Sequence, residues 1–190
     1  MNDIQSTVRL VMTPSTVVRR ALAVLAGAIF VAVSAQVAVP LPGTPVPVTL
    51  QVPAVLIVGA LLGARLGATS MVVYLLLGGA GLPMFAPMGV PGFARLIGPT
   101  GGYLLAYPLA AALVPVLAGN GRSWGRLALG LVAGLVAIHA GGVAQLAILT
   151  GDVSAAVALG SVPFLLLDVA KLVIAGLIVR RFAESMRALL

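Results

Sequence analysis

Long runs of apolar residues restrict what this chain can fold into more than any other feature of its sequence. Of its 190 residues, 61% are hydrophobic and only 8% are charged, which is not the composition of a water-soluble domain. About 20 apolar residues in a helix, at about 1.5 Å per residue, cross a bilayer core of roughly 30 Å. The sequence therefore predicts an all-α, polytopic membrane protein with six transmembrane helices, at residues 21–39, 48–64, 66–82, 100–118, 127–149 and 158–179.

The basic residues predict how these helices are oriented. A formal net charge of +7 could indicate a nucleic-acid partner, but the arginines occur singly or in pairs between apolar segments, so we expect no nucleic acid. Cytoplasmic loops of membrane proteins carry an excess of Arg and Lys. With both termini cytoplasmic, only Arg95 falls on the outer side, and nine arginines fall inside: Arg9, Arg19, Arg20, Arg65, Arg122, Arg126, Arg180, Arg181 and Arg187.

The last predicted helix contains two opposite charges, Asp168 and Lys171. Ionisable side chains at this depth cost roughly 2.5–3.5 kcal/mol each, and they usually face a cavity or a partner. Their i, i+3 spacing places both on one face of a helix, close enough to form an ion pair. Two interpretations remain open: the pair forms one wall of a ligand site, or it only locks the helix to its neighbours.

Two connecting segments also differ from ordinary loops. The prolines of residues 40–47 cannot continue a helix, so this segment must lie at the surface or line a cavity. Residues 83–99 mix turn-forming residues with large apolar ones. An apolar connection of this length is more typical of a lid that folds over something than of a simple loop.

Small residues recur on one stripe of the first predicted helix, among them Ala28 and Ala32. Small side chains at this spacing allow another helix to approach closely. The stripe fits an external partner and packing inside the bundle equally well.

An enzyme is the competing class of function. The segment Gly121-Arg-Ser-Trp-Gly125 matches the G-x-S-x-G pattern of a serine nucleophile, and His139 is the single histidine. Because the segment is predicted to lie in a cytoplasmic turn and His139 deep in the fifth helix, the two side chains cannot meet. His139 is instead predicted to form a hydrogen bond between helices. With no cysteine and no clustered ligands, we expect no catalytic residue, no metal site and no cofactor.

Four short motifs resemble those of one known family: Pro45-Val-Pro-Val-Thr-Leu-Gln51, Leu62-Gly-Ala-Arg-Leu-Gly67, Gly98-Pro-Thr-Gly-Gly-Tyr103 and Asp168-Val-Ala-Lys171. This is the BioY family, the biotin-specific substrate-binding components of energy-coupling-factor (ECF) vitamin transporters, and the resemblance covers residues 20 to 182 approximately. It implies a six-helix membrane fold with a biotin pocket near the outer face. It also implies a partner module made of a transmembrane coupling protein and two ATPases.

The resemblance further implies roles for individual residues. Tyr103, Asp168 and Lys171 correspond to the family's pocket, and Ala28 and Ala32 to an alanine pair that docks the coupling protein. Many relatives have an asparagine in the lid where this chain reads Met-Gly-Val-Pro-Gly at residues 88–92. The expected organisation is a cytoplasmic segment at residues 1–20, a six-helix substrate-binding domain at 21–182 and a cytoplasmic tail at 183–190, in the cell membrane. An alternative is a component or facilitator for another small vitamin.

The chemistry of biotin predicts which end lies where. Asp168 can accept an N–H of the ureido ring and Lys171 can donate to its C=O, while Tyr103 either borders the rings or is an interfacial tyrosine. The carboxylate should point outward to a wetter mouth. That mouth would be formed by Thr100 as a helix N-cap, the amide of Gly101, and Arg95, for which a loop or headgroup contact is the alternative.

Overall fold

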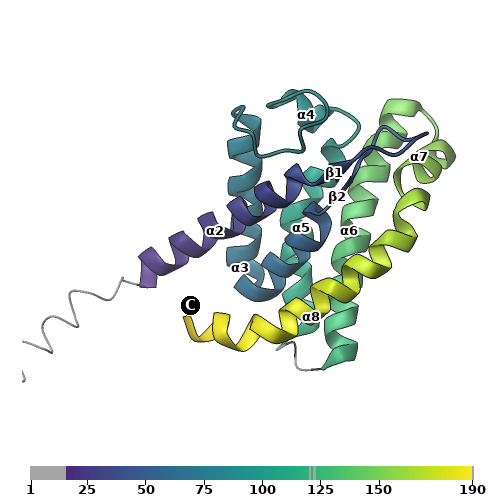
Figure 1. Cartoon of the computed structure of the whole chain (residues 1–190). Coiled ribbons are helices and arrows are strands. Elements are labelled where there is room, and N and C mark those ends of the chain that lie inside the picture. Colours follow the sequence, from purple (N-terminus) through teal and green to yellow (C-terminus); the bar gives the residue numbers. More distant parts are fainter. Residues whose placement is uncertain (1–15, 120, 122, 190) are drawn as a thin grey trace, which may run out of the picture.

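The computed structural model describes residues 16–119, 121 and 123–189, and Arg9 and Arg122 lie outside them. Helices dominate the described residues, as Figure 1 shows. The elements in order are α2 (Thr16–Gln36), β1 (Ala38–Val39), β2 (Val48–Thr49), α3 (Gln51–Gly79), α4 (Ala94–Ile97), α5 (Gly101–Ala118), α6 (Trp124–Thr150), α7 (Val153–Gly160), the 3-10 turn η1 (Val162–Phe164) and α8 (Leu165–Leu189).

Helix α3 reverses direction at Gly63 and so consists of two antiparallel halves. Gly63 has φ 81° and ψ 171°, a backbone region that only glycine adopts readily. The side chain of Gln51 reaches the Tyr74 hydroxyl, 23 residues further along the chain. A Cβ on Gly67 would lie 2.9 Å from the Cα of Gly59, which requires the two halves to lie side by side. The second and third predicted helices therefore exist, joined two residues before Arg65.

Five of the described helical segments are long and apolar enough to cross a membrane: Thr16–Gln36, Gln51–Gly79, Gly101–Ala118, Trp124–Thr150 and Val153–Met186. Because the second of them is the folded α3, this number agrees broadly with the six predicted helices. Large apolar side chains also cover the outside of the bundle, with Leu166 84% and Leu76 67% exposed. Such surfaces are stable in contact with lipid rather than water.

The sixth predicted helix is not continuous, so the prediction for residues 158–179 is wrong in detail. Helix α7 ends at Gly160, η1 contains Pro163, and α8 begins only at Leu165. Proline lacks the N–H that a continuing helix needs, and it disfavours helical geometry in the residue before it. As a consequence Asp168 lies in the first turn of α8. At its other end α8 continues to Leu189, through the predicted tail.

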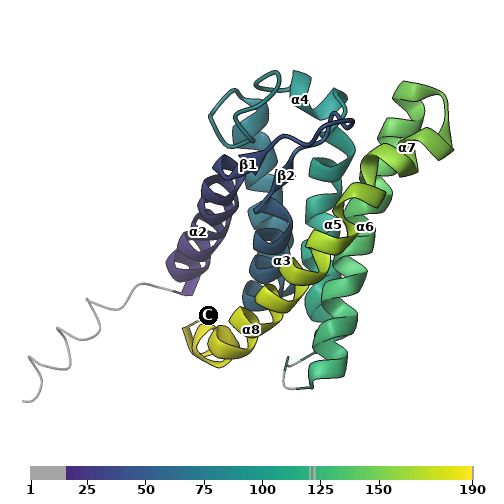
Figure 2. The same ribbon diagram turned by 45° about the vertical axis from the view of Figure 1, so that its right-hand side comes forward.

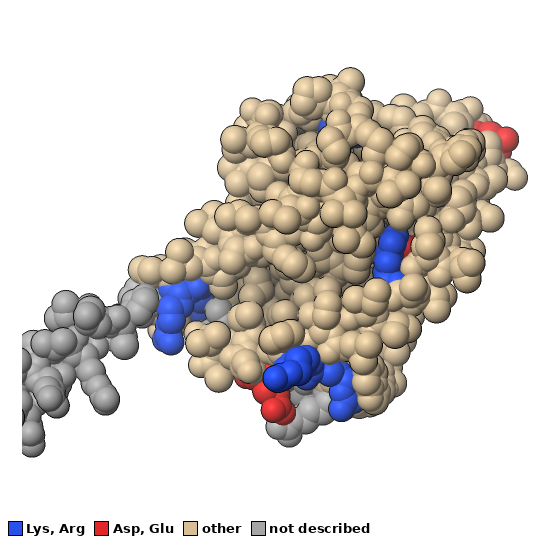
Figure 3. Space-filling model, viewed as in Figure 1, with Lys and Arg blue, Asp and Glu red and all other residues tan. Residues whose placement is uncertain are grey.

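The elements gather at two ends of the bundle. Figures 1 and 2 show the start of α2, the reversal of α3, the α5–α6 turn and the end of α8 at the lower end, and the β1–β2 hairpin, α4 and α7 at the upper end. The two strands pair antiparallel, with Val39 opposite Val48. Charge is scarce between the ends: in Figure 3 most basic and acidic groups of the visible face lie toward the lower end.

Ala28 and Ala32 pack inside the bundle. They are 0% and 8% exposed, and both belong to the buried core. One residue before Ala28, a Cβ on Gly27 would lie 2.7 Å from the Ser70 hydroxyl oxygen of α3. The small residues therefore let α2 approach α3 closely. The prediction that this alanine pair faces a docking partner is corrected by their burial, and the alternative of internal packing is the one observed.

Both described ends of the chain lie at the lower, arginine-bearing end, and the positive-inside rule predicts that this end faces the cytoplasm. The chain has no cysteine, so single cysteines can report the orientation. Gly125→Cys in the first turn of α6 should be protected from a membrane-impermeant maleimide in intact cells. Val90→Cys, at an upper-loop position 54% exposed, should react. The reverse labelling pattern would contradict the orientation.

Candidate functional site

Three adjoining hollows lie in the upper half of the bundle. The central hollow has a volume of about 450 Å³ including its open mouth, and its lining includes Thr49, Gln51, Phe85, Arg95, Thr100, Tyr103 and Tyr107. The inner hollow, about 310 Å³, has a lining that includes His139, Phe164, Asp168 and Lys171. Both share the walls Val46, Pro47, Thr49, Val52 and Tyr103. The outer hollow is bounded by the residue 40–47 loop and residues 88–90, and it shares Pro47, Arg95 and Thr100 with the central one.

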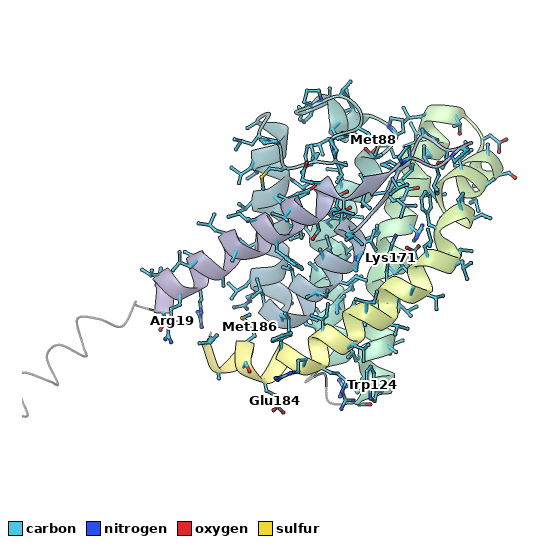
Figure 4. The ribbon with its side chains drawn as sticks, viewed as in Figure 1. Arg19, Met88, Trp124, Lys171, Glu184 and Met186 are labelled. Carbon is cyan, nitrogen blue, oxygen red and sulfur yellow. The ribbon has the colours of Figure 1, made fainter. Side chains whose placement is uncertain are left out.

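Three bonded polar side chains, His139, Asp168 and Lys171, lie at one end of the inner hollow. Lys171 Nζ lies 3.0 Å from Asp168 Oδ1, which confirms the predicted pair. His139 Nε2 lies 2.8 Å from Asp168 Oδ2, and His139 Nδ1 lies 3.0 Å from Ser161 Oγ. Asp168 is only 2% exposed. Figure 4 shows Lys171 on the stretch of α8 that crosses the other helices.

The break before α8 explains where the carboxylate sits. Since α8 begins at Leu165, Asp168 lies in its first turn. The first backbone N–H groups of a helix have no intrahelical partner, and the helix dipole is positive there. A negative charge is therefore more stable at this position than in the middle of a continuous helix, where the sequence alone would have placed it.

Tyr103 forms a wall between the central and inner hollows. Its hydroxyl donates to the Gly160 carbonyl at 2.7 Å, and the side chain is 7% exposed. Gly142 on α6 lies so close behind the ring that any side chain there would overlap it. The hydroxyl end of the ring is thus held by the hydrogen bond and by close contact with α6, and the hydroxyl supports the end of α7.

Arg95 is buried, which corrects the expectation of an arginine in a wet outer mouth. It is 7% exposed, donates through Nη2 to the Ala86 carbonyl, and lies against Gly89. Its Nε has no hydrogen-bond partner among the described residues. Burial lowers the pKa of the Arg95 guanidinium, although its ordinary value is high enough to keep it cationic. A buried cation with an unused donor therefore lies where the central and outer hollows meet.

The two residues at the start of α5 have different roles. Thr100 occupies the N-cap position but makes no side-chain capping bond, and it lines the central and outer hollows. Gly101 is a packing position: a Cβ there would collide with the Leu96 carbonyl. The structure thus brings Asp168, Lys171, Tyr103, Arg95 and Thr100 to the joined hollows, while Gly101 supports the helix entrance.

Residues 83–99 lie over the hollows, in agreement with the lid interpretation. Phe85 and Ala86 line the central hollow, and Met88, Gly89 and Val90 line the outer one. Amide side chains from neighbouring helices hold this segment through its carbonyls. Gln36 of α2 donates to Pro83 and Phe85, both at 3.3 Å, and Gln145 of α6 donates to Leu96 at 3.0 Å and Gly98 at 2.6 Å.

Several lining residues were not predicted as site residues, among them His139, Gln51 and Tyr107. His139 is the helix-to-helix hydrogen bonder that the sequence predicts, but its contact with Asp168 could not be foreseen. Gln51 donates to Tyr74 and accepts from Thr49. Tyr107 lies one turn beyond Tyr103, and this i, i+4 spacing was the available signal.

The joined hollows can hold a particular kind of molecule. One end offers a carboxylate and an ammonium whose charges cancel, which suits an uncharged group with both N–H donors and an acceptor. Arg95 offers a cation further out. Between them the walls are mostly apolar or aromatic side chains, such as Val46 and Tyr103.

Comparison with known proteins gives one consistent result. Residues 5–188 match the model of the BioY family. "Biotin transporter BioY" of Thermotoga maritima is 40% identical over 154 residues, 81% of this chain and 89% of that protein. "Probable biotin transporter BioY" of Pyrococcus horikoshii is 40% identical over 157 residues, 81% and 91% of the two chains. A solved structure, described as the S-component for biotin from an ECF-type ABC transporter, superposes with a TM-score of 0.81 at 25% identity, covering 91% of this chain and 95% of that one.

The two tyrosines of α5 allow a test of the site's construction. Tyr103→Phe leaves the buried Gly160 carbonyl without its donor, and we expect the free energy of unfolding to fall by about 0.5–1.5 kcal/mol. Tyr107 makes no hydrogen bond to any residue that the structure describes, so Tyr107→Phe is the matched control and should leave stability unchanged. Unfolding in detergent, followed by circular dichroism, measures both; equal effects would contradict the described geometry.

Proposed function

This chain belongs to the BioY family, and we propose from this premise that it captures biotin at the outer face of the cell membrane and delivers it inward with an ECF energising module. It acts as the membrane-embedded, substrate-binding component and not as an enzyme. The main structural support for this proposal is the buried cluster of Asp168, Lys171 and His139. The cluster lines a hollow, and Arg95 lies further out.

Biotin has three surfaces, and the joined hollows have a counterpart for each. The ureido ring has two N–H donors and one C=O acceptor, which match the Asp168 carboxylate and the Lys171 ammonium. The thioether ring and the chain are apolar and match the walls formed by Val46, Val52 and the ring of Tyr103. The carboxylate matches Arg95, whose Nε has no other partner among the described residues.

The lid supports the same orientation. Residues 83–99 cover the hollow on the side of Arg95, so a ligand that enters from the upper end with its ureido ring first would leave its carboxylate beside the cation and under the lid. At residues 88–92 this chain reads Met-Gly-Val-Pro-Gly, which offers no polar side chain to a ligand. We infer that Arg95 and Thr100 supply the polar contacts to the ligand on this side.

A partner must supply the energy for uptake against a gradient. The sequence has no phosphate-binding P-loop. We propose a transmembrane coupling protein and two ATPase subunits as that partner, supported by the likeness to an S-component of an ECF-type transporter. Since Ala28 and Ala32 are buried, we propose that the coupling protein docks on a different surface.

The ureido contacts can be tested with a double substitution. Asp168→Asn combined with Lys171→Met removes two charge-assisted hydrogen bonds, each worth roughly 1.5–3 kcal/mol, without leaving a lone buried charge. We expect biotin affinity to fall about 100-fold or more, measured by equilibrium binding to purified protein. The matched control is Arg181→Met with Glu184→Gln, which neutralises the same charge types at exposed positions of α8. Wild-type affinity in a folded double variant would refute the site.

The carboxylate contact can be tested from the ligand side. Because Arg95 is buried, its charged hydrogen bond should contribute roughly 1.5–3 kcal/mol, more than an exposed arginine would. Biotin amide should therefore bind about 10- to 100-fold more weakly than biotin. Arg95→Met should weaken biotin by a similar factor while affecting the amide little. If amide and acid bind the wild-type protein equally, the carboxylate lies elsewhere and the ligand orientation is reversed.

A further inference from the structure

We propose that His139 is a positioning residue that fixes the Asp168 carboxylate and thereby sets the preference of the site for ligands with a urea-like N–H donor. The inference rests on the proposed function, because it concerns how the same hollow recognises its ligand. It goes beyond that function by assigning a role in specificity to a residue of α6, a helix that contributes neither member of the ion pair.

The ring of His139 is held at both nitrogens. Nε2 lies 2.8 Å from Asp168 Oδ2 and Nδ1 lies 3.0 Å from Ser161 Oγ, at the break between α7 and η1. Two aromatic rings also pack beside the imidazole. The ring centroids of Tyr103 and Phe164 lie 6.2 and 6.3 Å from the centroid of His139. All these residues except Ser161 line the inner hollow.

The donors and acceptors of the cluster determine the protonation of the ring. An ionised Asp168 only accepts hydrogen bonds, so His139 must carry its proton on Nε2 to bond with it. In the neutral ring Nδ1 is then an acceptor, and the Ser161 hydroxyl donates to it. The Asp168 carboxylate therefore selects the tautomer, the Ser161 hydroxyl satisfies the other ring nitrogen, and this tautomer provides a donor to the carboxylate.

The carboxylate is consequently held through both oxygens, by donors from two helices. Lys171 of α8 donates to Oδ1, and His139 of α6 donates to Oδ2. Each oxygen keeps further acceptor capacity, which a ligand N–H can use. Without His139, Oδ2 would lose its fixed donor and the carboxylate could rotate about its contact with Lys171. A ligand N–H would then have to fix the orientation of the Asp168 carboxylate as well as bond to it, and this ordering would lower the affinity.

A purely structural role is the competing interpretation, since His139 also ties α6 to the segment before α8. The two roles differ in their consequence for ligands. Loss of a structural tie should weaken every ligand of the hollow by the same factor. Loss of a positioning contact should weaken ligands that donate to Asp168 and leave those without a donor unaffected.

The binding test uses three variants of the full-length protein and two ligands. His139→Phe keeps an aromatic ring but has no donor, His139→Gln retains an N–H that can reach Asp168, and Ser161→Ala removes the partner of Nδ1. The ligands are biotin and its cyclic carbamate analogue, in which oxygen replaces one ureido N–H. For His139→Phe we expect the affinity for biotin to fall roughly 10- to 100-fold. The affinity of the same variant for the analogue that lacks the bonded N–H should change by about twofold or less. His139→Gln should recover most of the biotin affinity.

Equal losses for both ligands, or no recovery with His139→Gln, would overturn the proposal in favour of a structural tie. If wild-type protein does not bind biotin at all, the proposed function fails, and that result is distinct from failure of this inference.

A second measurement does not depend on any ligand. His139 is the single histidine of the chain, so ¹⁵N-histidine labelling gives one ring system in the NMR spectrum. We expect a ring that carries a proton on Nε2, and the same in Ser161→Ala because the Asp168 carboxylate still accepts from it. A ring protonated on Nδ1 alone, or a ring that exchanges rapidly between tautomers in the wild-type protein, would refute the positioning role even if a variant failed to fold.

Discussion

A carboxylate kept ionised inside a membrane protein has to be compensated from several directions, and the site depends on this requirement. The neighbouring ammonium of Lys171 supplies the opposite charge. The imidazole of His139 bonds to the other oxygen, and the start of α8 adds the favourable end of its dipole. The break at Pro163 allows α8 to begin just before Asp168, α6 brings His139 to it, and α8 itself supplies Lys171. All three features are needed to stabilise the Asp168 carboxylate.

The lid illustrates how a segment with few polar side chains of its own can be held in place. Its carbonyl oxygens are the groups that are recognised, by Gln36 from α2, Gln145 from α6 and Arg95 from within the segment. Buried backbone carbonyls need donors, and long amide and guanidinium side chains can reach across from neighbouring elements to provide them. This arrangement leaves the lid's own side chains, such as Phe85, free to pack against Tyr74 and the hollow.

Much of the fold could be predicted from the sequence because lipid imposes simple rules. The lengths of the apolar segments predicted where the helices lie. The break between two apolar segments at Arg65 predicted the reversal of α3 to within two residues of its observed position at Gly63. The break before α8 was missed because residues 158–167 are mostly apolar, although Gly160, Ser161 and Pro163 were signals for it. The burial of Arg95 could not be predicted either, since it depends on how the lid folds over its own side chain. The Asp168–Lys171 contact was predictable because both residues lie on one short segment, whereas the link to His139 spans 29 residues and exists only in three dimensions.

The charges that line the three hollows also determine how the site responds to the electric field across the membrane. With histidine counted as neutral, Asp168 and Lys171 cancel and Arg95 leaves one net positive formal charge when the site is empty. A bound biotin carboxylate would cancel that charge. A transmembrane voltage would then act on the empty site and not on the filled one, with about 2.3 kcal/mol for each elementary charge moved through 100 mV. Under the proposed binding mode, a filled site would carry no net charge in this field, whereas an empty site would carry one positive charge.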